Sequence, residues 1–197
     1  MRLLQELIRR LVPLLAVFAA VIPLLAAAQS AALQEGNQYL RLKNPQPVET
    51  GKKIEVLEFF SYGCPHCGDL EPVLQGWLKT IPADVQFRRV PVMFQERWAP
   101  LAKIYYTLEA LGEEARLTPE VFSALHGKGL SLWQEKTFFD WAAGQGLDRK
   151  KVEDMYNSFG IGGKVNRARL AAQAYQVQSV PLVIVDGKFL TNRISSH

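Results

Sequence analysis

The chain has 197 residues and a net charge of +4, from 23 lysines and arginines against 19 aspartates and glutamates. This length suits one domain with a hydrophobic core, or a small domain that carries a large insertion, and not two independent domains. No basic run with interleaved aromatic residues follows the N-terminal segment, so we expect no nucleic-acid partner.

Residues 1–28 have the pattern of a secretory signal peptide. Three arginines and one glutamate accompany the uncharged stretch Leu11–Ala28, which ends in the small residues Ala26–Ala28 typical of a cleavage site. An uncleaved membrane anchor is the alternative, because this stretch approaches the length of a membrane-spanning helix. Pro13 and Pro23 inside the stretch favour cleavage. We therefore expect an exported protein, whose mature form carries a net charge of +2.

The next segments predict an extended arm and a buried strand. Residues 29–53 are polar and contain Asn44-Pro45-Gln46-Pro47, which favours an extended arm leading into the domain. We expect regular structure to begin with Ile54–Phe60, whose apolar residues fall on both faces of the pleat, as in a strand covered on both sides. Within this strand, Glu55 is expected at the solvent edge of the sheet.

A helix and a second strand follow. Apolar residues recur at helical spacing over residues 70–78, and this helix should begin near Cys64, with Pro65 in its first turn. The segment 85–92 (VQFRRVPV) predicts a second strand, parallel to the first because a helix connects the two. Pro91 places the end of this strand at an edge or a turn.

The rest of the chain predicts a long helical block and a hairpin. Helical periodicity and N-cap signals extend over about residues 99–177. A strand at Leu182–Val185, a turn at Asp186-Gly187 and a strand at Lys188–Leu190 then predict a β-hairpin. The order strand, helix, strand, helical block and hairpin is that of an α/β domain interrupted by an all-helical insertion.

The only two cysteines of the chain, Cys64 and Cys67, lie three positions apart. A disulfide that closes so short a loop removes almost no chain entropy, so we interpret the pair as reactive rather than structural. In thiol–disulfide exchange a thiolate attacks, and a second sulfur nearby resolves the mixed disulfide. At a helix N-terminus Cys64 would be exposed and its thiolate stabilised by backbone N–H groups and the helix dipole, whereas Cys67 would be shielded one turn later.

Pro65 and His66 separate the two cysteines. His66 can favour the Cys64 thiolate through its donor group, and through its charge when protonated, which makes the disulfide a stronger oxidant. The alternative is that His66 is a solvated residue without a role. A structural zinc site would need four ligands, and two cysteines with one histidine cannot complete it. We therefore expect no metal, and no cofactor besides the redox-active disulfide Cys64–Cys67.

The segment 57–67 (LEFFSYGCPHC), together with Ser179-Val180-Pro181, resembles the DsbA family of periplasmic disulfide-forming proteins. The resemblance implies a thioredoxin fold with an inserted all-helical domain. Residues 54–96 and 169–190 would form the two thioredoxin-like parts, and residues 97–168 the insertion. It also implies a periplasmic location, a strongly depressed thiol pKa and an oxidising disulfide.

The resemblance implies roles for further residues. Val180–Pro181 would be a cis peptide bond beside the sulfurs that leaves a backbone group free for an extended client chain and blocks metal capture, where the alternative is an ordinary proline at the start of a strand. Glu58 matches the family's buried acid, which exchanges a proton with Cys67, where the alternative is a strand glutamate at the solvent edge. Some members pair this acid with a basic residue, for which both Arg88 and Arg89 qualify.

The implied function is oxidation of unfolded or newly exported cysteine-containing proteins by the Cys64–Cys67 disulfide, with reoxidation by a DsbB-type quinone-linked membrane oxidase. We expect a monomer, since no dimerisation domain is evident. A reductase or isomerase is a nearby alternative, and a periplasmic holdase or metallochaperone is an alternative from another class.

Six aromatic residues could line an apolar groove for clients, although we expect more of them in the core. They are Phe94, Trp98, Trp133, Phe138, Phe139 and Trp141. His126 is expected at a helix end rather than in catalysis.

The C-terminal segment bears on stability. DsbA-like proteins normally continue into a C-terminal helix, for which residues 191–197 are too short and polar. Either the sequence is truncated, or one face of the sheet lacks the cover of that helix.

Overall fold

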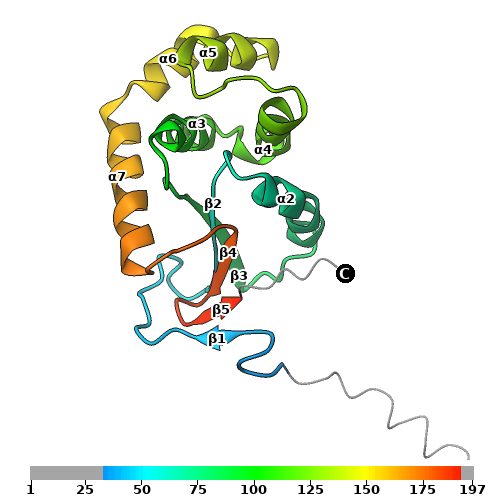
Figure 1. The fold of residues 1–197 in the computed structure, drawn as a ribbon, viewed down its shortest axis with the longest axis vertical. Coiled ribbons are helices and arrows are strands. Elements are labelled where there is room, and N and C mark those ends of the chain that lie inside the picture. The colour runs from blue at the N-terminus through cyan, green and yellow to red at the C-terminus, as the bar shows by residue number, and fades with distance from the viewer. Residues whose placement is uncertain (1–32, 192–197) are drawn as a thin grey trace, which may run out of the picture. The chain divides into compact units, whose positions relative to one another are not determined.

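The computed structural model describes residues 33–191 (Figure 1). The signal peptide predicted at 1–28 and the end of the chain at 192–197 lie outside the described residues. Residues 33–37 belong to a separate N-terminal unit, and the fold presented below is that of residues 38–191. Within the described range, no helix has the length and apolar character needed to cross a membrane.

Five strands of the described chain form one mixed sheet in the order β1-β5-β4-β2-β3. β2 and β3 are parallel, as the sequence predicts for two strands connected by a helix, and the other neighbouring pairs are antiparallel. The strands are β1 (Leu40–Arg41), β2 (Ile54–Phe60), β3 (Val85–Pro91), β4 (Leu182–Val185) and β5 (Phe189–Thr191).

The short strand β1 falls within the segment for which the sequence predicts only an extended arm. Leu40 and Arg41 pair with Leu190 and Phe189 of β5, so this part of the arm forms one edge of the sheet. A strand of two residues has no periodicity by which the sequence could reveal it. Its pairing depends on the β4–β5 hairpin, which lies about 150 residues later in the chain.

The hairpin forms at the predicted turn. Asp186 and Gly187 both have positive φ angles, of 53° and 62°, as a tight two-residue connection requires. A side chain at Gly187 would also collide with the backbone carbonyl oxygen of Gln46, so only glycine fits at this position. The backbone N–H of Gln46 donates to the carbonyl of Gly187 at 2.9 Å, and so the turn holds the arm against the sheet.

β2 lies between β4 and β3 within the sheet and is buried on both faces, as its sequence predicts. The expectation for Glu55 is wrong: its side chain is 1% exposed rather than at a solvent edge. Arg88 donates to the Glu55 carboxylate at 2.8 Å and compensates the loss of solvent around it. Pro91 lies at the end of β3, an edge strand of the sheet, as predicted.

The helices cover the sheet and extend beyond it. In Figure 1, α2 and α7 lie on opposite sides of the strands, and α3 to α6 lie together at one end. α7 contacts both β3 and α3, and it spans position 168, where the sequence places the end of the insertion. The helices of the described chain are α2 (Pro65–Leu78), η2 (Glu96–Trp98), α3 (Ala99–Ala110), α4 (Glu114–Phe122), the π-helix η3 (Ser123–Gly127), α5 (Glu135–Gly144), α6 (Arg149–Tyr156) and α7 (Phe159–Ala174).

One hydrophobic core joins the sheet to the helical segment. Phe60 of β2 packs edge-to-face on Tyr62, Tyr105 and Phe122, with ring centroids 5.1, 5.2 and 6.4 Å away. Most of the six singled-out aromatic residues belong to this core, as expected. Those buried are Trp98, Phe138, Phe139 and Trp141, whereas Phe94 and Trp133 are 46% and 37% exposed.

Candidate active site

Cys64 is the N-cap residue of α2, and Pro65 is its first helical residue, as the sequence predicts. The preceding loop is fixed by the backbone N–H of Cys64, which donates to the carbonyl of Ser61 at 3.0 Å, and by that of Gly63, which donates to the Ser61 hydroxyl at 3.1 Å. An N-cap side chain faces the unpaired N–H groups of the first helical turn. The sulfur of Cys64 therefore occupies a position that favours negative charge.

The surroundings of Cys64 lower its pKa from 9.0 to about 6. The largest contribution is a hydrogen bond from the thiol of Cys67, followed among the lowering effects by the backbone N–H groups of Cys67 and His66 and by the charge of His66. Burial acts in the opposite direction, because it penalises the charged form. Cys64 is thus a thiolate near neutral pH in the reduced protein.

Cys67 has the opposite behaviour. Its hydrogen bond to Cys64 and its burial both raise the pKa of its thiol well above the ordinary value, and the charge of Glu58 raises it further. The two sulfurs therefore differ in ionisation, and the proton that they share remains on Cys67. Both cysteines are free thiols in this structure.

The expected exposure of Cys64 needs correction. Cys64 is 8% exposed and Cys67 is 1% exposed, so Cys67 is shielded as predicted but Cys64 is also largely buried. The thiol of Cys64 approaches the carbonyl of Val180 at 3.5 Å, from a loop 116 positions later in the chain. A helix N-terminus alone is open to solvent, and it is this loop that partly covers the sulfur.

The Val180–Pro181 peptide bond is cis, in agreement with the expectation from the family resemblance. It immediately precedes β4, whose residues Leu182 and Val183 pair with Phe59 and Glu58 of β2. This pairing brings the loop beside the end of β2 and therefore beside the cysteine motif that follows it. The structure thus places Val180 and Pro181 at the same site as Cys64.

His66 lies on the surface beside the cysteines. Its side chain is 83% exposed, and its Nδ1 is 3.4 Å from a carboxylate oxygen of Asp69. Its influence on Cys64 operates through charge and through the backbone N–H, and no side-chain hydrogen bond between the two residues is present in this part of the chain.

Glu58 is buried in β2, and Arg89 is the basic residue that accompanies it. The Nε of Arg89 donates to the Glu58 carboxylate at 2.7 Å, and both side chains are 2% exposed. Arg88, the neighbouring candidate, points to the other face of the sheet and pairs with Glu55. Burial nevertheless raises the pKa of Glu58 from 4.5 to about 7, because it outweighs the attraction of Arg89. Glu58 can therefore gain or lose a proton near neutral pH.

Two further carboxylates share the Arg89 guanidinium, and neither is predicted from the sequence pattern. Arg89 donates to Glu71 of α2 at 2.6 Å and to Glu114 of α4 at 2.8 Å. Glu71 lies four positions after Cys67, one helical turn further along α2, which is a signal that could have suggested it. Glu114 comes from the helical segment and has no local signal, because only the packing of α4 brings it to β3.

A chain of hydroxyl groups connects this cluster to the loop before Cys64. The Tyr62 hydroxyl is 2.8 Å from that of Thr118, which donates to Glu114 at 3.4 Å. His126 lies at the end of η3, as expected for a helix-end residue, and its Nε2 donates to the carbonyl of Tyr62 at 2.8 Å. The helical segment therefore positions the reactive loop as well as covering it.

Metal ligands do not gather in the part of the chain that the structure describes. Within residues 33–191 there is no cluster of three or more histidine, cysteine, aspartate or glutamate side chains that could hold a metal ion. The chemistry that the site supports is that of its two sulfurs, one ionised and one protonated, above a buried acid.

Comparison with known proteins identifies the family. The family model of the DSBA-like thioredoxin domain matches residues 83–195. The thiol:disulfide interchange protein DsbA of Bordetella parapertussis is 41% identical over 161 residues, which cover 82% of this chain and 77% of that protein. This chain belongs to the DsbA family. It is accordingly a thiol:disulfide oxidoreductase with a thioredoxin fold, as the sequence predicts.

Solved DsbA structures support the same assignment. The crystal structure of Pseudomonas aeruginosa DsbA matches with a TM-score of 0.77 and 39% identity, covering 81% of this chain and 83% of that one. The reduced DsbA1 of Neisseria meningitidis matches with a TM-score of 0.76 and 31% identity, covering 83% and 87%. The all-helical insertion in the thioredoxin fold is therefore a feature that this chain shares with the DsbA family.

Proposed function

We infer that this DsbA family member is an oxidase that transfers its Cys64–Cys67 disulfide to reduced proteins exported to the periplasm. The observation that carries this inference is the contrast between the two sulfurs: Cys64 at the N-cap of α2 has a lowered pKa, and Cys67 has a raised one. Stabilising the Cys64 thiolate stabilises the reduced protein and so raises the oxidising power of its disulfide, by about 30 mV for each unit of pKa.

In the first step, a client thiolate attacks the sulfur of Cys64. The Cys64–Cys67 bond breaks, a mixed disulfide forms between the client and Cys64, and Cys67 leaves with the electron pair. Because the pKa of Cys67 is raised, this thiolate takes a proton, and Glu58 below it is the group that supplies it. The pKa of Glu58, at about 7, suits a proton donor at neutral pH.

In the second step, another thiolate of the client attacks the client's own sulfur in the mixed disulfide. Cys64 leaves as a thiolate, the client gains its disulfide and the protein is left reduced. A leaving thiol with a low pKa departs faster, so the same surroundings that stabilise the Cys64 thiolate also accelerate this release. The client is oxidised by two electrons and the enzyme is reduced by two.

Val180 and Pro181 serve client binding in this proposal. The proline has no N–H to pair with. In the disulfide form Cys64 has no S–H to donate, so the Val180 carbonyl beside its sulfur is free to accept a hydrogen bond from an extended client chain. Pro65 and His66 favour the thiolate from the first turn of α2. The redox-active disulfide is the only cofactor, the protein acts as a monomer, and a DsbB-type quinone-linked membrane oxidase restores the disulfide.

Two measurements test the oxidase function. The reduction potential from equilibration with glutathione should be well above the value of about −270 mV that is typical of thioredoxin, and a potential as low as that would favour a reductase. Oxidation of a dithiol peptide by the protein should be lost in Cys64→Ala. Full activity of this variant would contradict the catalytic role of Cys64, and absence of oxidation by the parent protein would instead favour a binding protein such as a holdase.

A further inference from the structure

The outer face of α7 exposes two large apolar side chains. Phe159, the first residue of the helix, is 96% exposed, and Leu170, about three turns later, is 56% exposed. Their spacing of eleven residues places them on the same face of the helix. The opposite face of α7, which includes Ile161 and Ala168, is buried against the protein. Phe159 and Leu170 therefore lie outside the hydrophobic core.

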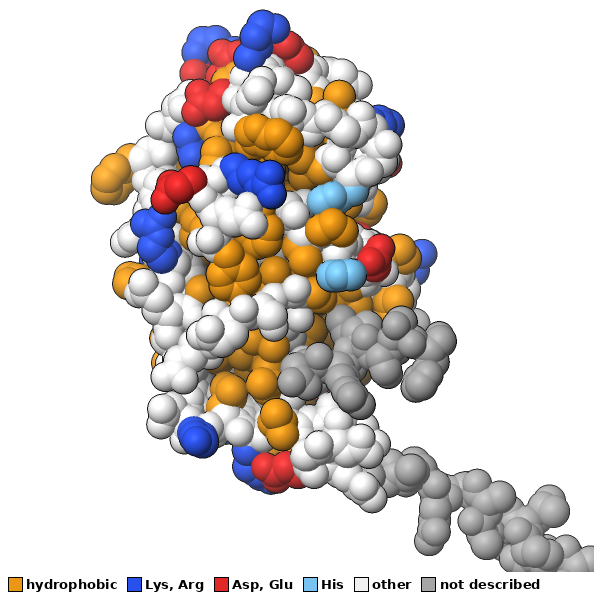
Figure 2. Space-filling model, viewed as in Figure 1, with side chains coloured by type: hydrophobic (Ala, Val, Ile, Leu, Met, Phe, Trp, Pro, Cys, Tyr) orange, Lys and Arg blue, Asp and Glu red, His pale blue; other side chains and the backbone are white. Residues whose placement is uncertain are grey.

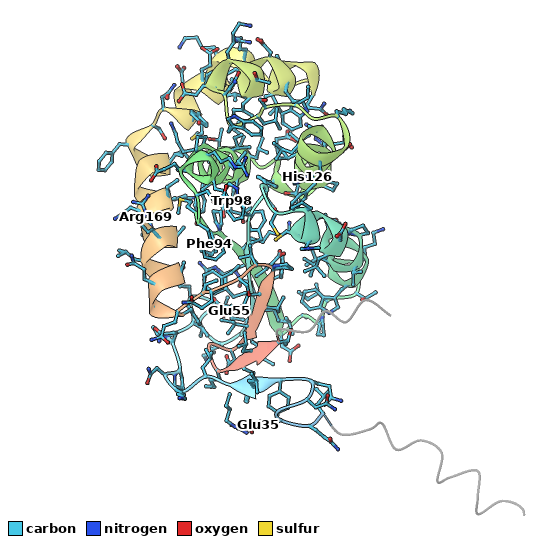
Figure 3. The ribbon with its side chains drawn as sticks, viewed as in Figure 1. Glu35, Glu55, Phe94, Trp98, His126 and Arg169 are labelled. Atoms are coloured by element: carbon cyan, nitrogen blue, oxygen red, sulfur yellow. The ribbon has the colours of Figure 1, made fainter. Side chains whose placement is uncertain are left out.

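Two arginines flank these apolar residues. Arg167 and Arg169 are exposed, and neither forms an ion pair within residues 33–191. A Cβ atom at Gly163, which lies on the same face as Phe159, would be 3.6 Å from the Nη1 of Arg167. The guanidinium of Arg167 therefore extends along the outer face toward Phe159. Figure 3 shows Arg169 on the outer side of α7, pointing away from the sheet.

The charge of this face is positive. α7 contains no aspartate or glutamate that could compensate its arginines. The acids in the second half of the preceding helix α6, Glu153 and Asp154, already pair with Arg149 and Lys150. Figure 2 shows apolar and basic side chains along the edge of the molecule where α7 lies. A positive surface with exposed apolar side chains complements a negatively charged partner that can also accept apolar groups.

We propose that the outer face of α7 docks the protein on the surface of an anionic phospholipid bilayer. Phe159 and Leu170 enter the headgroup region, and Arg167 and Arg169 contact the lipid phosphate groups. Helices that lie on membrane surfaces combine basic residues with exposed Phe and Leu residues in the same way. Basic residues close to an anionic bilayer are attracted by its negative surface potential, so the docking is reversible and sensitive to salt.

The shape of this face favours a bilayer over a second protein. Phe159 and Leu170 are about 16 Å apart along the helix axis, at 1.5 Å per residue, and Gly163 and Asn166 lie between them. A protein interface needs a continuous packed core and buries about 800 Å² on each partner. Lipid headgroups rearrange around separate side chains, so two isolated apolar residues can each enter the bilayer.

Docking through α7 leaves the reactive cysteine accessible. α7 and α2 lie on opposite sides of the strands in Figure 1, and Cys64 is the N-cap residue of α2. The outer face of α7 can therefore contact a bilayer while the cysteine motif reacts with other molecules. The docking does not involve the two sulfurs, so we expect it in both the reduced and the oxidised protein.

Sedimentation with phospholipid vesicles tests the docking. The protein and its variants are exported by an expressing bacterium and purified from the periplasm, so that all of them carry the same natural N-terminus. The vesicles contain either phosphatidylcholine alone or equal parts of phosphatidylcholine and phosphatidylglycerol. We expect binding to the anionic vesicles at low salt to be about tenfold stronger than binding to the neutral vesicles. High salt should release the protein from the anionic vesicles.

Variants assign the binding to the outer face of α7. The double variant Arg167→Gln, Arg169→Gln should bind the anionic vesicles about tenfold or more weakly, and Phe159→Ser should also bind about tenfold more weakly. The matched controls are the double variant Lys79→Gln, Lys128→Gln, which removes the same charge from exposed positions elsewhere, and Val73→Ser, which changes an exposed apolar residue of α2. Both controls should bind like the parent protein.

The same variants should keep the folding stability and the peptide oxidation rate of the parent protein. Each substitution replaces an exposed side chain, and such substitutions usually have small effects on stability. Urea unfolding and oxidation of a dithiol peptide in the absence of vesicles would show this. A loss of vesicle binding in the α7 variants is then due to the surface of α7 and not to misfolding or to the redox site.

Three outcomes would overturn the docking. The first is an absence of binding to the anionic vesicles at low salt, and the second is equal binding by the parent protein and the double arginine variant. The third is self-association of the parent protein in sedimentation velocity that Phe159→Ser abolishes, without vesicle binding, because the outer face of α7 would then join two copies of this chain. None of these outcomes affects the oxidase function, which the reduction potential tests separately.

Discussion

Arg89 and Glu58 face each other on the neighbouring strands β3 and β2, and the Arg89 Nε donates to the Glu58 carboxylate at 2.7 Å. One guanidinium thereby compensates three carboxylates, those of Glu58, Glu71 and Glu114. Burial raises the pKa of both Glu58 and Glu71, the neighbouring carboxylates raise it further, and the attraction of the one guanidinium only partly opposes this rise. The cluster thus contains a buried carboxyl group, that of Glu58, which can gain or lose a proton near neutral pH and whose charge acts on Cys67.

Glu58→Gln should slow the oxidation of a dithiol peptide by about tenfold or more, because it removes the proposed proton donor to Cys67. In the parent protein the supply of protons should fall as the pH rises through about 7, the pKa of Glu58. The variant should lose this part of the pH–rate profile. Stopped-flow rates over the neutral pH range would show it, with Glu49→Gln, which alters an exposed partner of Arg88, as the control. An unchanged profile in Glu58→Gln would contradict the role.

Arg89→Met should destabilise the protein by about 3–5 kcal/mol, because it leaves buried carboxylates without a partner. The free energy of unfolding in urea measures this loss. Arg149→Met is the control: it removes an arginine with two ion pairs, to Asp140 and Glu153, that lie on the protein surface. Its loss of stability should be much smaller, since exposed ion pairs contribute little. Similar losses in the two variants would show that the buried cluster is not important for stability.

The stability of the reduced protein should depend on pH through Cys64. Its pKa is about 6 in the folded protein against an ordinary value of 9.0. A lowered pKa stabilises the folded state, fully so above pH 9, and this contribution is lost as the pH falls through 6. The oxidised protein has no thiol. Reduced protein should therefore gain stability relative to oxidised protein between about pH 6 and pH 8, as urea unfolding of both forms would show.

A Cys64→Ser variant provides the control for this pH dependence. This variant lacks the low-pKa thiol, so its stability should show no such gain relative to the oxidised parent protein over the same pH range. Thiolate absorbance of the parent protein against pH should give the same midpoint, about 6. A midpoint near 9 would contradict the proposed stabilisation of the thiolate.

Gly63→Ala should destabilise the protein by about 1–3 kcal/mol, because the added methyl group would overlap the indole of the buried residue Trp98. Trp98 also lines a cavity beside Cys64, so its displacement should change the tryptophan fluorescence. Gly76→Ala is the control, since Gly76 lies inside α2 with open space around it. That substitution should stabilise the protein by about 0.5–1 kcal/mol. Equal effects in thermal unfolding would show that the indole adapts without cost.

Elements whose pattern is local were predicted well from the sequence. β2 has apolar residues on both faces, α2 begins at Pro65 directly after Cys64, and the β4–β5 hairpin has its turn residues in place. The family resemblance added the cis peptide at Pro181, which composition and periodicity cannot show. The failures concern burial: Glu55 is buried by its pairing with Arg88, and Cys64 is partly covered by the Val180 loop.

The sequence by itself determined the reactive pair, because two cysteines around Pro65-His66 at a helix N-terminus need only local backbone geometry to become a thiolate and its resolving thiol. The tertiary structure alone decided which charges surround that pair. Strand register selected Arg89 rather than Arg88 for Glu58, and the packing of α4 added Glu114. Such contacts join segments far apart in the chain, so their partners depend on how whole elements pack and not on any local pattern.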